Sequence, residues 1–85
     1  MSTVKLSNIT IAQFEAFLAY MGCEKVDSGN TGHFKWKRQG SIRAVVFQTH
    51  IEPIPEFVIA NNLRNIGITK KQFKDWLKAQ NKKEK

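Results

Sequence analysis

The chain has 85 residues, 41% of them hydrophobic, which suits one small domain and is too apolar for a disordered segment. No apolar run approaches the roughly 20 residues of a membrane-spanning helix, and the first residues lack the apolar segment of a secretory signal. Because Cys23 is the single cysteine, a disulfide within the chain is excluded, and we expect a cytoplasmic protein. The net charge of +7 favours a negatively charged partner.

The first predicted element is a helix over residues 11–21. Thr10 and Gln13 have the spacing of a capping box, in which each side chain bonds the backbone N–H of the other residue. Gly22 is placed to end this helix, after apolar residues at helical spacing: Ile11, Phe14, Phe17, Leu18 and Met21. Residues 23–26 are a candidate for a short strand, and residues 27–30 have the composition of a loop.

From His33 onward the pattern changes to the alternation of a strand. Phe34 and Trp36 fall on one face, whereas His33, Lys35 and Lys37 fall on the other. Residues 38–41 predict a hairpin turn, and residues 42–48 predict the next strand. That strand is apolar on both faces, so the pattern does not decide which of the two faces is buried. We assign its residues 45 and 47 to a face that meets a partner.

Two helices complete the predicted order. Pro55 suits the first turn of a helix whose apolar stripe runs from Phe57 to Ile66, with Gly67 after it. Thr69 and Gln72 repeat the capping-box spacing and open a third helix, and we expect the basic residues 80–85 to fray. The chain therefore predicts a single α+β domain with the order α-β-β-β-α-α.

Several classes of functional site have no support in the pattern. One cysteine and two distant histidines do not form a zinc set, and no glycine-rich phosphate loop is present, so we expect neither a metal nor a cofactor. Cys23 is expected to be a small buried residue, and His50 a surface residue at the end of a strand.

The charge distribution singles out the region that begins at His33. Residues 33–43 contain no acid and carry a net charge of +4, and residues 70–85 carry +5, which is typical of a site for a polyanion. An imidazole can accept and donate protons near neutral pH. His33 is therefore a candidate general acid/base for RNA cleavage. The predicted phosphate contacts are Lys35, Lys37, Arg38 and Arg43.

Three segments resemble a known family. Residues 31–36, Thr-Gly-His-Phe-Lys-Trp, resemble the Gly-Ser-His-aromatic strand opening of the HicA-type mRNA interferase toxins. Residues 45–50 resemble that family's apolar strand ending in Pro-x-His, with Gln48 in place of the proline. Residues 63–73 are similar to its Leu-Arg-x-Ile-x-x-Gly-Leu-Ser-x-x-x-Phe close. The resemblance extends from Ile11 to about Leu77.

The resemblance implies a fold like that of a double-stranded-RNA-binding domain, with helices on one face of a three-stranded antiparallel sheet and an extra C-terminal helix here. It implies a toxin of a type II toxin–antitoxin system that cleaves mRNA through His33, without a metal. It also implies a HicB-like antitoxin, which we expect to cover the active face and to contact Val45 and Phe47. Two alternatives are a non-catalytic RNA-binding domain of the same fold and a protein-interaction domain that docks a partner on those two residues.

Overall fold

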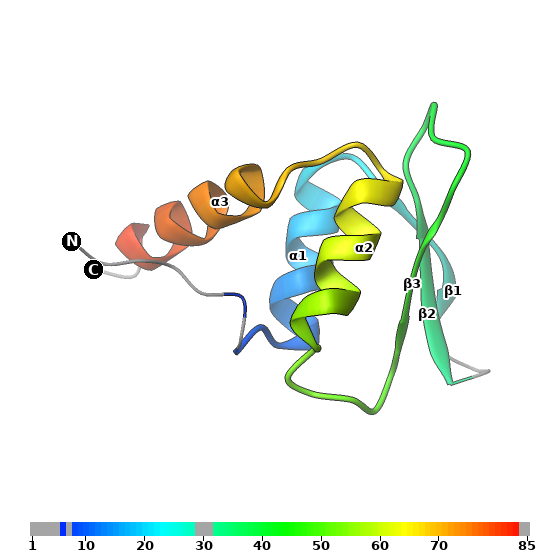
Figure 1. Ribbon diagram of the computed structural model, residues 1–85, viewed down its shortest axis with the longest axis horizontal. Helices are drawn as coiled ribbons and strands as arrows, with labels where there is room; N and C mark the ends of the chain where they lie inside the picture. The colour runs from blue at the N-terminus through cyan, green and yellow to red at the C-terminus, as the bar shows by residue number, and fades with distance from the viewer. Residues whose placement is uncertain (1–5, 7, 29–31, 84–85) are drawn as a thin grey trace.

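The computed structural model describes residues 6, 8–28 and 32–83. Helix α1 (Ile11–Tyr20) is followed by strands β1 (Glu24–Ser28), β2 (His33–Lys37) and β3 (Val45–Gln48), and then by helices α2 (Glu56–Asn65) and α3 (Lys70–Lys83). The strands form one antiparallel sheet in the order β1-β2-β3, so the predicted α+β class and element order are confirmed. Helices α1 and α2 cover one face of the sheet, and α3 extends from them on the side away from it (Figure 1).

The helix ends form where the capping residues predict them. The Thr10 hydroxyl accepts a hydrogen bond from the Gln13 backbone N–H at 3.1 Å, and the Gln13 side chain accepts one from the Thr10 backbone N–H at 2.8 Å. Thr69 and Gln72 repeat both bonds at the start of α3. At the other end, α1 and α2 each finish before a glycine with positive φ, namely Gly22 and Gly67. These short-range signals therefore fix the boundaries of the helices.

Aromatic side chains link the three layers. The Phe14 ring of α1 lies 5.1 Å from the Phe47 ring of β3 and 5.8 Å from the Phe73 ring of α3, measured between ring centroids. Phe17 lies 4.6 Å from Phe73 in the same way. All four rings are buried, so α3 belongs to the core although it lies far from the sheet. None of the helices in the described part of the chain combines the length and apolar character needed to cross a bilayer.

Two strands differ from their predicted bounds. Strand β1 runs to Ser28, beyond the predicted end at residue 26. Strand β3 begins at Val45 instead of residue 42, because the pairing of β2 with β3 ends at the Trp36–Val45 pair. Residues 38–44 consequently form a long connection in which Ile42 is 99% exposed. Helix α3 ends at Lys83, residues 84–85 lie outside the described residues, and the fraying expected for residues 80–85 stays a prediction.

Candidate functional site

The outer face of β2 carries the residues that the alternation selected. His33, Lys35 and Lys37 are exposed, whereas Phe34 is half-buried and Trp36 is buried against the helices. Successive outer side chains of a strand stand about 7 Å apart. The imidazole and the two ammonium groups therefore form a row on the sheet face that no described helix covers.

Backbone contacts fix the position of His33. It pairs with Gln48 of β3, and the preceding carbonyl, that of Gly32, accepts hydrogen bonds from the Thr49 N–H at 3.0 Å and the Thr49 hydroxyl at 3.4 Å. Gly32 has a φ of +88°, in the left-handed region that favours glycine. This conformation accounts for a glycine directly before His33, where the family pattern has serine.

An acidic residue lies across the sheet from Lys37. Glu24 of β1 pairs with Lys37, and opposite charges at facing positions stabilise a sheet. Lys35 pairs with the apolar Val46 of β3. Glu24 therefore reduces the net positive charge of the outer face below the value that residues 33–43 suggest by themselves.

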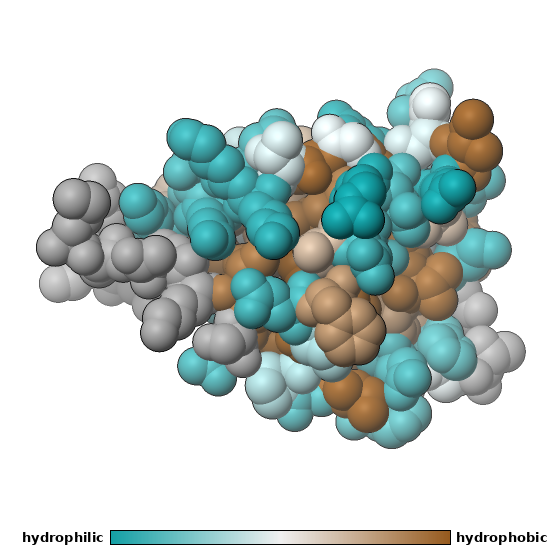
Figure 2. All heavy atoms as spheres, in the orientation of Figure 1, coloured by the Kyte–Doolittle hydropathy of each residue, from teal (hydrophilic) through white to brown (hydrophobic). Residues whose placement is uncertain are grey.

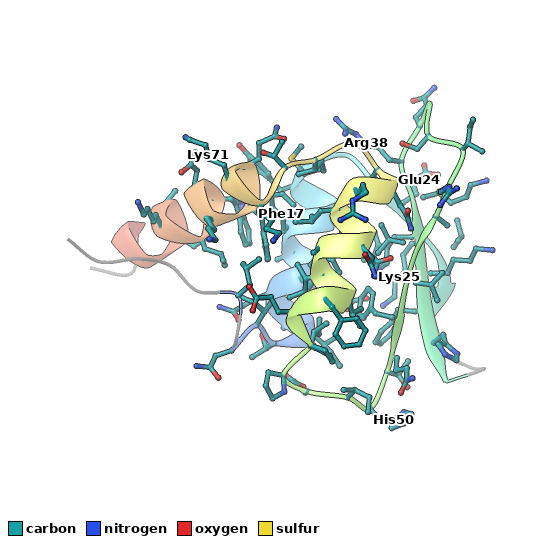
Figure 3. All side chains as sticks on the ribbon, viewed as in Figure 1. Phe17, Glu24, Lys25, Arg38, His50 and Lys71 are labelled. Atoms are coloured by element: carbon teal, nitrogen blue, oxygen red, sulfur yellow. The ribbon has the colours of Figure 1, made fainter. Side chains whose placement is uncertain are left out.

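The two predicted arginine contacts lie apart from this row. Arg38 donates from Nη1 to the carbonyl oxygen of Ile66 at 2.7 Å, and so caps the C-terminal end of α2, where a positive charge is favoured (Figure 3). Arg43 is exposed in the β2–β3 connection and shares a hollow with Arg64 of α2. Of the four predicted phosphate contacts, only Lys35 and Lys37 therefore accompany His33.

The predicted orientation of β3 is wrong. Val45 and Phe47 are 0% and 3% exposed, so their side chains belong to the core and face no partner. The cause lies in the register: Val45 pairs with Trp36 and Phe47 with Phe34, and cross-strand partners share one face of a sheet. The exposed apolar residue of β3 is Val46, at 43%.

A groove beside His33 contains residues that the sequence pattern did not select. It has a volume of about 380 Å³ and is mostly apolar, with a lining that includes Val46, Gln48, Ile51, Phe57 and Val58. Phe57 was assigned to the buried stripe of α2, but it is 69% exposed. The spacing between Phe57 and the buried Ile59 could have predicted this exposure. Two residues correspond to about 200° around a helix, which places Phe57 almost opposite Ile59.

The remaining candidates have structural or peripheral positions. His50 is exposed in the turn after β3, as predicted. Cys23 is buried, also as predicted; this burial raises the pKa of its thiol, and the positive charge of Arg38 partly opposes the shift. A thiol with a raised pKa is protonated near neutral pH and is a poor nucleophile.

No protein-family model, curated protein or solved structure matches this chain significantly. The resemblance to HicA-type toxins therefore remains a prediction from three short segments.

Proposed function

We propose that this chain is a HicA-type mRNA interferase, the toxin of a type II toxin–antitoxin system, which cleaves mRNA in the cytoplasm. The observation that carries the proposal is the row formed by His33, Lys35 and Lys37 on the outer face of β2. Exposed imidazole and ammonium groups on one strand suit a substrate that brings both a proton to remove and a phosphate to hold.

The reaction follows from the chemistry of RNA. The His33 imidazole removes the proton of a 2′-hydroxyl, and the 2′-oxygen forms a bond to the adjacent phosphorus while the bond to the 5′-oxygen breaks. The resulting imidazolium returns the proton to the departing 5′-oxygen. The products are a 2′,3′-cyclic phosphate and a 5′-hydroxyl, and Lys35 holds the phosphate. The substrate supplies the nucleophile, His33 transfers the protons and Lys35 holds the phosphate, so the proposed reaction requires no metal.

A HicB-like antitoxin is the proposed inhibitor. Its contact on β3 is Val46 in place of the buried Val45 and Phe47, because Val46 shares the outer face with His33 and Lys35. Val26 of β1, 50% exposed and in one hollow with Lys37, is a second apolar contact for a protein that covers the row. Such a cover would prevent RNA from reaching His33.

Cleavage of single-stranded RNA in the presence of EDTA tests the proposed activity. We expect His33→Ala to lower the cleavage rate by about 10²- to 10⁴-fold, because one general acid/base is lost. The thermal unfolding midpoint should not change, because His33 is exposed. His50→Ala is the matched control: it removes the other exposed histidine and should cleave at the wild-type rate.

Two outcomes would reject the assignment. Full activity of His33→Ala would show that another group performs the proton transfer. Salt-sensitive RNA binding by the wild-type protein without any cleavage would leave the non-catalytic RNA-binding domain as the function. RNA that carries 2′-O-methyl groups throughout should bind and remain intact, because the attacking hydroxyl is blocked.

A further inference from the structure

The groove beside His33 is lined by exposed apolar side chains from three segments. Phe57 of α2, Val46 of β3 and Ile51 of the following turn all line it, and they are 69%, 43% and 38% exposed. Figure 2 shows apolar side chains gathered over the region where α2 and β3 lie side by side. Contiguous exposed apolar surface on a small domain marks a binding site, since exposing it to water is unfavourable.

Phe57 also forms part of a second hollow. That hollow has a volume of about 510 Å³ and is lined by Arg64 of α2 and Lys70 of α3, with Glu56 as its acid. Phe57 and Arg64 are seven residues apart in α2, which places them on one face of the helix. The exposed ring therefore stands between the groove that contains His33 and a hollow with two basic side chains.

The charges around the ring indicate what it binds. Lys35 lies across the sheet from Val46 at one end of the surface, and Arg64 and Lys70 lie at the other end. An apolar, aromatic platform flanked by cations matches a nucleotide, which has a flat apolar base and an anionic phosphate. The amide of Gln48, also in the lining, offers a donor and an acceptor for the edge of a base.

We propose that this groove is a subsite for an unpaired nucleobase, stacked on Phe57, next to the phosphate at His33. The location relative to the cleaved bond rests on the proposed function, whereas the base-binding role of Phe57 does not. It follows that the substrate is single-stranded RNA, because the bases of a duplex are already stacked and paired and cannot enter the groove. The strand would continue from the groove across Phe57 towards Arg64 and Lys70.

Binding measured without cleavage tests the subsite. In a His33→Ala background, the probes are a fluorescent eight-nucleotide single-stranded RNA and the duplex of the same sequence, compared by anisotropy. We expect the single strand to bind more tightly, and Phe57→Ala to weaken its binding by about tenfold or more. Phe57→Trp should retain the affinity, because indole also provides a stacking surface.

The control is another exposed apolar residue. Tyr20 of α1 has the same exposed fraction as Phe57, 69%, and lies outside the groove and the hollow beside Arg64, so Tyr20→Ala should leave RNA affinity unchanged. Unchanged affinity in Phe57→Ala, equal loss in Tyr20→Ala, or tighter binding of the duplex would overturn the subsite. A dimer in sedimentation that Phe57→Ala dissociates would assign the groove to a second copy of the chain and would also overturn it.

The cleavage assay separates this inference from the proposed function. If the wild-type protein binds RNA through Phe57 but does not cleave it, the proposed nuclease activity is wrong and the nucleobase subsite is supported. If the wild-type protein cleaves RNA and Phe57→Ala has the same KM and the same RNA affinity, the nuclease activity is supported and the nucleobase subsite is wrong.

Discussion

Glu15 of α1 joins the helix to two strands through a single carboxylate oxygen. Its Oε2 accepts a hydrogen bond from Trp36 Nε1 at 3.2 Å and forms an ion pair with Lys25 Nζ at 2.9 Å. The Lys25 ammonium also lies 4.3 Å from the centroid of the Phe34 ring, a cation–π contact. These groups are partly shielded from water, so their interactions are stronger than those of an exposed pair.

Glu15→Ala is therefore expected to destabilise the domain. Loss of a hydrogen bond and an ion pair on one carboxylate should lower the free energy of unfolding by about 1–2 kcal/mol, measured by urea denaturation. Asp75→Ala is the matched control, because Asp75 forms an ion pair of similar length, 3.1 Å, with Lys71 on the exposed side of α3. That change should cost about 0.5 kcal/mol or less. Equal losses would contradict the role of Glu15.

At the scale of single residues, the sequence predicts which face of a strand a side chain occupies better than it predicts which group that side chain contacts. Strand alternation places His33, Lys35 and Lys37 together because successive side chains point to opposite sides, a rule that needs no tertiary information. Arg38 belonged to the same basic run, but it caps a helix end 28 residues later. The partner of Arg38 depends on the packed fold, and no local pattern reveals it.

At the scale of elements, the edge of β3 is closed by side chains of α2. The Asn62 amide donates to the Val46 carbonyl at 2.9 Å and accepts from the Val46 N–H at 3.2 Å, and Asn65 donates to the Ala44 carbonyl at 3.3 Å. Asn62 is only 5% exposed. An edge strand with free backbone groups can pair with another chain, and these asparagines occupy those groups.

Asn62→Ala should destabilise the domain and open this edge. We expect a loss of about 1–3 kcal/mol, because buried polar groups lose their partners, together with concentration-dependent self-association in light scattering. Asn61→Ala provides the comparison: its side chain is exposed and makes one long hydrogen bond, 3.5 Å, to Arg64. It should change stability by less than about 0.5 kcal/mol. A monomeric Asn62→Ala protein of unchanged stability would refute the proposed closure.

The elements also separate what was predictable from what was not. Helix starts at Thr10 and Thr69 follow from two residues three apart, so the sequence predicts them well. The orientation of β3 was predicted wrongly because residues 42–48 are apolar on both sides. Only the register with Phe34 and Trp36 decides which side is buried, and register is a property of two strands.

At the scale of the whole molecule, α3 is part of the fold and not an appendage. Its Phe73 ring is fully buried among the rings of Phe14 and Phe17 on α1. A domain of this size has a total stability of only about 4–13 kcal/mol. One large core side chain therefore contributes a substantial fraction of the total.

Phe73→Ala tests this contribution. We expect the free energy of unfolding to fall by about 3–5 kcal/mol, measured by urea denaturation followed by circular dichroism. Tyr20→Ala removes a neighbouring aromatic ring that is 69% exposed, and it should cost about 1 kcal/mol or less. If Phe73→Ala lost the α3 helix but kept the full stability, α3 would be dispensable.

The long connection between β2 and β3 has a practical consequence. It projects beyond the helices in Figure 1, and its Ile42 is almost fully exposed, whereas Cys23, the single cysteine of the chain, is buried. Ile42→Cys would therefore introduce the one thiol that is open to maleimide reagents. A fluorophore attached there would lie outside the core and outside the groove at His33, next to the hollow that Arg43 and Arg64 share, and could report on binding of RNA there.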